Sequence, residues 1–171
     1  TYFAISFSQP IKDYGYVDKK KPVYTGFWRR FKMDRNFPEI GGRSVVSYFN
    51  FDTSSNKELV VKVALSAVST EGALKNLLAE AGGKSFEQVV AEASEAWNEK
   101  LELFEIEGTE DQKAMFYTSL YHTMINPSVY MDVDGHYRGL DHNVHQAEGF
   151  TNYTIFSLWD TYRAEHPFLN L

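Results

Sequence analysis

One short segment of the sequence combines three side-chain types that suit the binding of a sugar. It runs from Ser157 to Arg163 and includes Trp159 and Asp160. In a helix, Trp159, Asp160 and Arg163 would share one face, because residues three and four apart are neighbours. A carboxylate accepts and a guanidinium donates hydrogen bonds, so together they can hold adjacent hydroxyls while an indole ring stacks beside them. The same residues also fit a plain helix start with an exposed ion pair, and their chemistry alone leaves both interpretations open.

Two carboxylates further upstream resemble the start of a calcium-binding loop. Asp132 and Asp134 precede Gly135 at a spacing that oxygen ligands for calcium could use. An EF-hand loop requires a Glu at its twelfth position, and the corresponding residue here is Asn143. A tight turn at Asp134-Gly135 between two strands explains these residues better.

Three histidines lie close together after this turn and raise the question of a zinc site. They are His136, His142 and His145, with Asp141 among them. Imidazole and carboxylate groups are zinc ligands, but zinc sites bring their ligands together at characteristic spacings. No predicted helix places His142 and His145 on one face, so we interpret them as separate loop histidines.

Composition excludes several classes of protein. A basic and aromatic run over residues 19–32 could contact a nucleic-acid backbone. However, the net charge is +5 over residues 1–50 and −11 over residues 51–171, so most of the chain would repel phosphate. The chain has no cysteine and no apolar stretch long enough for a membrane span. We therefore expect no nucleic-acid partner, no disulfide and no membrane span.

The first part of the chain is predicted to form β-strands. The clearest strand covers residues 59–65, where apolar residues alternate with others at a period of two. Further strands are predicted at 2–8 and 45–51, separated from one another by glycine-rich and polar turns. This spacing of short strands is typical of an antiparallel β-sandwich.

The pattern changes to helices after residue 70. A short helix is predicted over 71–81, ended by Gly82-Gly83. Two capping boxes, Ser85 to Gln88 and Thr109 to Gln112, open two longer helices, because each hydroxyl and glutamine can satisfy a free backbone amide. Pro127 marks the end of the second.

A hairpin and one more helix are predicted beyond Pro127. We expect strands over 129–133 and 136–140 to pair across the Asp134-Gly135 turn, and a helix to start near Ser157. The chain thus begins in a predicted strand and ends in a predicted helix, so both ends are expected to be cuts within a longer protein.

Three stretches of the sequence, in this order, resemble glycoside hydrolase family 92. They are FYTSLYH from Phe116, DGHYRG from Asp134 and YTIFSLWDTYRAEHP from Tyr153. The resemblance implies an α+β chain with three parts. Residues 1–68 would be the C-terminal part of an antiparallel β-sandwich and 69–108 a helical linker. Residues 109–171 would supply the first helices and a β-hairpin of an (α/α)6 catalytic barrel.

The resemblance also implies a function and a role for the sugar-binding segment. The family implies an exo-acting α-mannosidase, often specific for α-1,2 linkages, that inverts the anomeric carbon with the help of calcium. Trp159, Asp160 and Arg163 would contact the terminal sugar at the −1 subsite. The acid, the base and most calcium ligands of the family lie downstream of Leu171, so no catalytic residue and no metal ligand is assigned here.

The implied partners are α-mannoside glycans and the rest of the catalytic domain, and the implied location is periplasmic or secreted. The alternative is a non-catalytic carbohydrate-binding or structural β-sandwich with a helical extension.

Overall fold

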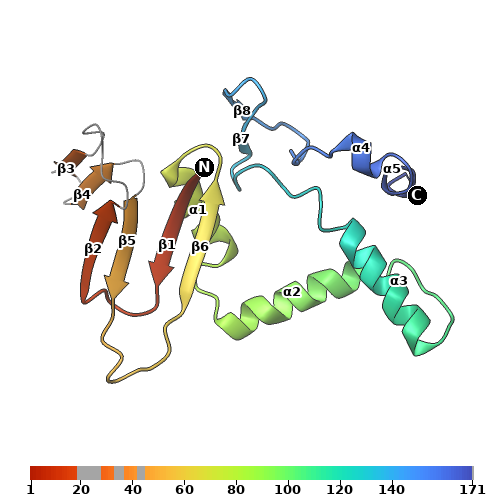
Figure 1. Ribbon diagram of the computed structural model, residues 1–171, viewed down its shortest axis with the longest axis horizontal. Coiled ribbons are helices and arrows are strands. Elements are labelled where there is room, and N and C mark those ends of the chain that lie inside the picture. Colours follow the sequence, from red (N-terminus) through yellow and green to blue (C-terminus); the bar gives the residue numbers. More distant parts are fainter. Residues whose placement is uncertain (19–27, 33–36, 42–44, 171) are drawn as a thin grey trace. The chain divides into compact units, whose positions relative to one another are not determined.

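The computed structural model describes residues 1–18, 28–32, 37–41 and 45–170 (Figure 1). The chain divides into two compact units, a larger one of Thr1–Ser6 with Lys62–Leu171 and a smaller one of Phe7–Val61. Residues 19–27 of the basic, aromatic run lie outside the described part. The predicted division at residues 68 and 108 stays a prediction.

The smaller unit consists of short antiparallel strand pairs. Strand β2 (Asp13–Asp18) pairs with β5 (Val45–Asn50), with Asp13 opposite Asn50. Strand β3 (Trp28–Lys32) pairs with β4 (Phe37–Gly41). The ring of Phe7 contacts those of Phe49 and Phe51, with centroids 5.1 and 4.9 Å apart. The predicted strand over 45–51 is therefore confirmed.

Strand β6 (Val61–Ser66) pairs with β1 (Tyr2–Phe7) in the larger unit, and helix α1 (Thr70–Glu80) follows it. The predicted alternation along β6 is real, but the apolar face with Val63 and Leu65 is exposed. The residues on the opposite face are less exposed, and Lys62 donates from Nζ to the carbonyls of Ala81 and Lys84 just beyond α1. Lys62 thereby satisfies carbonyls that the end of a helix leaves free.

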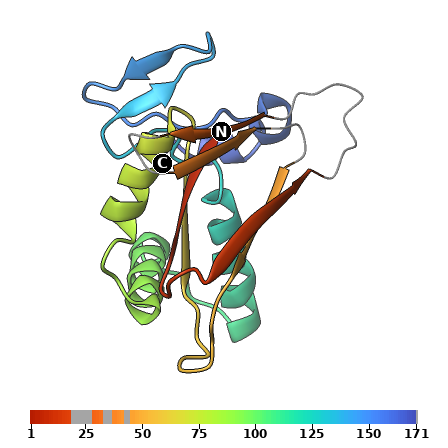
Figure 2. The same cartoon turned by 90° about the vertical axis from the view of Figure 1, so that its left-hand side faces the viewer.

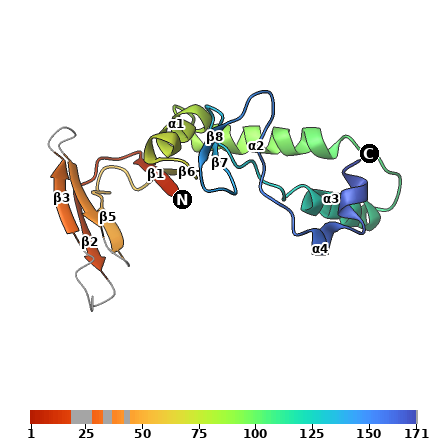
Figure 3. The same ribbon diagram turned by 90° about the horizontal axis from the view of Figure 1, so that it is seen from above.

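Both predicted capping boxes are present. The Ser85 hydroxyl accepts from the Gln88 amide, and the Gln88 side chain accepts from the Ser85 amide, at the start of α2 (Phe86–Leu101). Thr109 and Gln112 repeat the arrangement at α3 (Glu110–Thr123). Figure 3 shows α2 as one continuous helix. These boxes depend on residues three apart, so local sequence is enough to predict them.

Helices α2 and α3 contact each other through aromatic side chains. Trp97 meets Tyr121 edge to face with ring centroids 4.5 Å apart, and the Tyr117 hydroxyl donates to the Phe104 carbonyl at 2.9 Å. Leu120 is buried, whereas no residue of α2 is fully buried. The apolar residues Phe86, Val89 and Val90 of α2 are exposed among the described residues.

The strand that follows the Gly135 turn pairs with a different segment from the one predicted. Strand β7 (His136–Arg138) pairs with β8 (Val144–Gln146), as Figure 2 shows, and not with residues 129–133. The turn at Gly135 exists, with φ +83° and a hydrogen bond from its amide to the Asp132 carbonyl. Val129 instead bridges to Tyr153. The Asp132 amide still donates to the His136 carbonyl across this turn, but the next amide, that of Val133, donates to Asn76 on α1.

The last predicted helix is also different. It starts near Ser157 as expected, but α4 (Leu158–Thr161) is a single turn, and a second turn, α5 (Glu165–Phe168), follows after a short break. Ser157 makes no side-chain capping bond to α4. The described chain is thus a mixed α and β structure with small two-stranded sheets and a few helices. This content of helices and strands agrees with the predicted α+β class.

Candidate functional site

The structure places Trp159 and Asp160 on the exposed turn α4. The Trp159 side chain is 86% exposed, and Asp160 is also exposed. Thr161 donates from its hydroxyl to the Ser157 carbonyl, which ties the turn together. An indole so open to solvent has a free face on which a ligand ring could stack.

Arg163 does not pair with Asp160. The helix ends at Thr161, so Arg163 lies in the following turn, where its Nε donates to the Tyr162 hydroxyl at 2.9 Å. Its guanidinium carbon is also 5.7 Å from the centre of the Tyr162 ring. Among the described residues the Asp160 carboxylate has no hydrogen-bond or ion-pair partner. The interpretation of Asp160 and Arg163 as an exposed ion pair is therefore not supported by the structure.

The end of this segment is fixed by ring contacts that sequence reasoning did not single out. His166 meets Phe156 edge to face at 4.9 Å, and Phe168 lies 5.5 Å from Phe104. The Nδ1 atom of His166 is buried and has no hydrogen-bond partner. Buried polar atoms are normally hydrogen-bonded, so His166 is a further candidate for a functional residue in this segment. Its position in the AEHP stretch was the only signal in the sequence.

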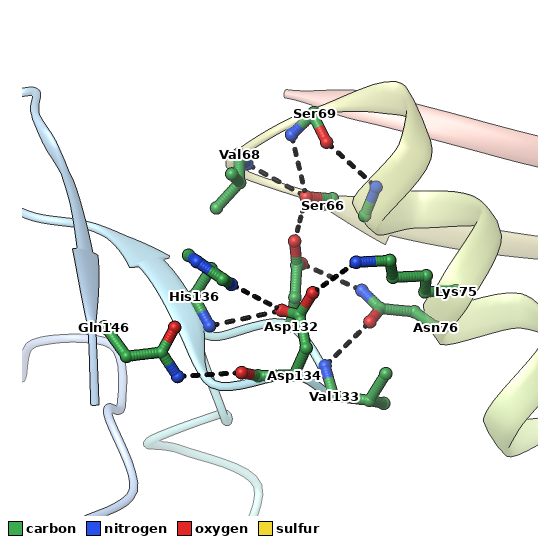
Figure 4. Close-up of polar contacts among 11 residues, drawn as sticks. Ser66, Val68, Ser69, Lys75, Asn76, Asp132, Val133, Asp134, His136 and Gln146 are labelled. Atoms are coloured by element: carbon green, nitrogen blue, oxygen red, sulfur yellow. Dashed lines mark hydrogen bonds and ion pairs between the residues drawn. The ribbon is translucent and has the colours of Figure 1, made fainter. Parts of the chain in front are cut away.

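A buried carboxylate connects α1 to the segment that leads into the hairpin (Figure 4). Asp132 is 3% exposed, and its two oxygens accept from the Ser66 hydroxyl at 2.8 Å and from the Asn76 side-chain amide at 2.9 Å. Asn76 in turn accepts from the Val133 amide at 2.9 Å. Every oxygen of the carboxylate therefore has a donor, which is what a buried charge requires.

Gly72 allows this approach. A Cβ atom at Gly72 would overlap the Oδ2 atom of Asp132 and lie 2.9 Å from the Ser66 hydroxyl oxygen. Only a residue without a side chain fits there. We call Ser66, Gly72, Asn76 and Asp132 the Asp132 cluster.

Asp134 forms a second, more exposed connection to α1. It accepts from Lys75 Nζ at 2.7 Å, and its other oxygen lies 2.9 Å from Nδ1 of His136. These hydrogen bonds, that of Lys75 first and that of His136 next, hold the pKa of the Asp134 carboxyl well below its usual range. The same contact raises the pKa of Lys75. Both carboxylates of the supposed calcium loop are thus used to join the turn to α1.

The remaining histidines, His142 and His145, have different surroundings. His145 Nε2 lies 3.0 Å from both oxygens of Asp141, and this contact, with further bonds from Asn143, lowers the pKa of the Asp141 carboxyl. A Cβ at Gly139 would crowd this pair. His142 lies in the left-handed region, with φ +64°. Within the described part of the chain no three His, Asp or Glu side chains gather as they would around a metal.

That finding is also the test for calcium. The two carboxylates of the turn, Asp132 and Asp134, already accept hydrogen bonds from Asn76 and Lys75 of α1. The described residues by themselves therefore do not form a binding site for a calcium ion.

A pocket of about 650 Å³ lies beside the hairpin. Its wall combines residues of the β7–β8 region with the extended segments around Val129 and Tyr153, all within the larger unit. We call it the hairpin pocket, and its lining is Tyr130, Tyr137, Arg138, Gly139, Leu140, Asp141, His145, Asn152, Tyr153, Thr154 and Ile155. Because its strands pair differently from the prediction, this pocket could not be anticipated from the sequence.

The fold and these segments are those of a known class of glycoside hydrolase. Residues 72–171, more than half of the chain, match the glycosyl hydrolase family 92 catalytic domain. The chain therefore belongs to glycosyl hydrolase family 92, as its motifs indicated. A comparison with curated proteins gave no match.

Solved structures agree with this assignment. The chain is similar to the family GH92 alpha-mannosidase BT3965 from Bacteroides thetaiotaomicron, with 41% identity and a TM-score of 0.84 over 99% of this chain. A second structure of that enzyme, in complex with mannoimidazole, gives the same values. The chain spans 22% of the length of that enzyme. The GH92 family glycosyl hydrolase ccman5 matches with 24% identity and a TM-score of 0.72, covering 92% of this chain and 20% of that one, and shows the fold alone.

Within the described residues no helix is both long and apolar enough to cross a membrane.

Proposed function

We propose that this chain is part of an exo-acting α-mannosidase that removes terminal mannose from α-mannoside glycans. The observation that carries the proposal is the similarity, at 41% identity over 99% of the chain, to an enzyme described as an alpha-mannosidase. That enzyme also has a structure with mannoimidazole. The preferred linkage in the proposal is α-1,2.

Trp159, Asp160 and Arg163 would contact the terminal mannose. Asp160 would accept hydrogen bonds from two sugar hydroxyls, Arg163 would donate to a neighbouring oxygen, and Trp159 would stack on the apolar face of the ring. The support is that the indole is open to solvent and that the Asp160 carboxylate has no partner among the described residues. Arg163 would exchange its bond to Tyr162 for one to the sugar.

The proposed reaction inverts the anomeric carbon. An inverting glycosidase uses one carboxylic acid to protonate the leaving oxygen and one carboxylate to activate a water on the opposite face. No pair of this kind is assigned in this chain, and the proposal places the acid, the base and the ligands of an activating calcium ion in the rest of the catalytic domain. The location proposed for the enzyme is periplasmic or secreted.

The test is hydrolysis by the full-length protein that contains this chain. We expect it to release mannose from α-1,2-mannobiose in the presence of calcium, faster than from the α-1,3 and α-1,6 isomers, and to stop when a chelator is added. Proton NMR of the first product should show β-mannose, because inversion of an α-linkage gives the β-anomer. No release of mannose with calcium present would refute the proposal, and initial α-mannose would refute inversion alone.

A non-catalytic carbohydrate-binding role is the second candidate. The exposed Trp159 suits it as well as it suits an enzyme. Binding of mannobiose without hydrolysis by the full-length protein would favour this candidate.

A further inference from the structure

The hairpin pocket is distinct from the α4 segment that the proposed function uses. Its volume of about 650 Å³ lies in the usual range for small-ligand sites, which is roughly 300–1,000 Å³. Neither Trp159, Asp160 nor Arg163 lines it.

Three tyrosines dominate the pocket and are open to a ligand. Tyr130 and Tyr153 are 41% and 50% exposed, and Tyr137 packs on His145 with ring centroids 5.6 Å apart. None of the three hydroxyls forms a hydrogen bond within the part of the chain that the structure describes. Each tyrosine thus offers an apolar ring face together with a free donor and acceptor.

The charged groups of the pocket are already engaged. The Asp141 carboxylate pairs with His145, and Arg138 donates from Nε and Nη1 to the carbonyls of Ala67 and His142 at 2.8 and 2.7 Å. The pocket therefore offers no unpaired carboxylate and little free positive charge. A neutral ligand with hydroxyl groups and an apolar face matches this lining better than an ion does.

The walls are held in place by backbone bonds. The Tyr130 amide donates to the Asn152 carbonyl, the Asn152 side chain donates back to the Tyr130 carbonyl, and the Thr154 amide donates to the Ser128 carbonyl. The backbone that carries these rings is therefore already in place before a ligand binds.

The pocket is also close along the chain to α4, whose Trp159 and Asp160 would contact the terminal mannose in the proposed function. Its lining reaches Ile155, four residues before Trp159. Four residues span at most about 14 Å even when fully extended. One oligosaccharide could therefore contact both places.

We propose that the hairpin pocket binds a further pyranose unit of the glycan, by stacking on Tyr130 or Tyr153 and by hydrogen bonds to the tyrosine hydroxyls. The identity of the glycan as a mannoside rests on the proposed function, whereas the presence of a sugar site rests on the pocket itself.

The test compares a short and a long substrate of the full-length protein. We expect Tyr153→Ala and Tyr130→Ala each to lower the ratio of kcat/KM for α-1,2-mannotriose to that for p-nitrophenyl α-mannoside, roughly tenfold for the loss of one stacking contact. Tyr153→Phe keeps the ring and should lower the ratio less. Tyr14→Ala is the matched control, because Tyr14 is also 50% exposed but lies on β2. It should leave the ratio unchanged.

An unchanged ratio in both alanine variants would overturn the proposal, as would an equal fall on both substrates, which indicates a structural effect. If wild-type protein hydrolyses neither substrate, the proposed function fails, and calorimetry with mannotriose then decides about the pocket. Affinity about tenfold weaker in Tyr153→Ala would support the sugar site. Equal affinity, or no binding by the wild type, would overturn it.

Discussion

The Asp160 carboxylate and the Trp159 ring, both on α4, are open to solvent in the described part of the protein. Sequence chemistry left a sugar contact and an exposed ion pair as equal alternatives. The structure shows why spacing could not decide: α4 ends at Thr161, so Arg163 leaves the helical face it was predicted to share. Arg163 bonds to Tyr162 instead.

Asp160→Ala in the full-length protein should weaken mannose binding and leave the fold intact. Loss of hydrogen bonds to a charged group costs about 1.5–3 kcal/mol, which corresponds to roughly 10- to 150-fold in affinity. Because Asp160 is exposed, thermal unfolding should be nearly unchanged. Calorimetry with mannose measures the affinity, and Asp111→Ala, at the exposed start of α3, is the control. Equal affinity in both variants would favour a structural role for Asp160.

Asp132 is a buried residue whose partners are far away in the sequence. Ser66 and Asn76 precede it by 66 and 56 residues, so no local pattern could indicate the Asp132 cluster. From the sequence, a calcium loop was considered at this position and a tight turn was preferred. A carboxylate in a turn looks the same in both cases, and only its donors distinguish them.

Asp132→Ala should loosen the connection between α1 and the hairpin. The substitution leaves the Ser66 hydroxyl and the Asn76 amide without their acceptor, at a cost of about 2–4 kcal/mol. Hydrogen exchange of amides in residues 72–77 and 132–138 should become faster, while α3 stays protected. Asp111→Ala serves again as the exposed control. Unchanged exchange in these two ranges would show that the cluster contributes little to local stability.

The elements differ in how far the sequence determines them. Helices α2 and α3 begin where their capping boxes predicted, because the signal lies within four residues. The partner of β7 was predicted wrongly. Asp132 bonds to His136 across the expected turn, but the Val133 amide bonds to Asn76 on α1, and β7 forms its ladder with β8. The starts of α2 and α3 therefore follow from local sequence, whereas the pairing of β7 depends on contacts between distant residues.

The link between α1 and the turn at Gly135 should weaken in acid. The pKa of Asp134 is lowered in the folded protein, so its ionised form contributes stability above the usual carboxyl pKa of about 3.9. That contribution is lost progressively as the pH falls through this value towards the folded pKa. The raised pKa of Lys75 acts at the alkaline end, where stability is lost as the pH rises through it.

We expect hydrogen-exchange protection of residues 132–138 to fall between pH 6 and pH 3 beyond the intrinsic pH effect on exchange. Asp134→Asn should show a smaller fall, because its side chain cannot titrate. Asp111→Asn should behave like the wild type. An identical fall in Asp134→Asn would assign the acid sensitivity to other groups.

Within the described part of the chain, few apolar side chains are buried and many are exposed. Among the described residues the buried hydrophobic side chains are Ala73, Leu77 and Leu120. By contrast, Val63 and Leu65 on β6 are 59% and 63% exposed, and Phe86 on α2 is 65% exposed. Large exposed apolar surfaces normally mark contacts with other protein. In the proposed function, the rest of the enzyme covers these faces of β6 and α2.

The 171-residue chain produced alone should therefore self-associate. We expect light scattering to show species larger than 19.7 kDa and a hydrophobic dye to bind strongly. The full-length protein is the control and should bind less dye per molecule. A monomeric chain without dye binding would contradict the expectation that these faces need further protein.

The long sequence separation within the Asp132 cluster has a consequence for synthesis of the protein. Helix α2 can start to form as soon as its own residues are available, since its capping box and its backbone hydrogen bonds are local. Ser66 and Asn76 must wait until Asp132 has been made, 66 and 56 residues later. During that interval the Ser66 hydroxyl and one N–H of the Asn76 side chain lack the Asp132 oxygens that accept from them in the folded protein. Folding of the larger unit on the ribosome is thus expected to occur in two stages, with a late step gated by one carboxylate.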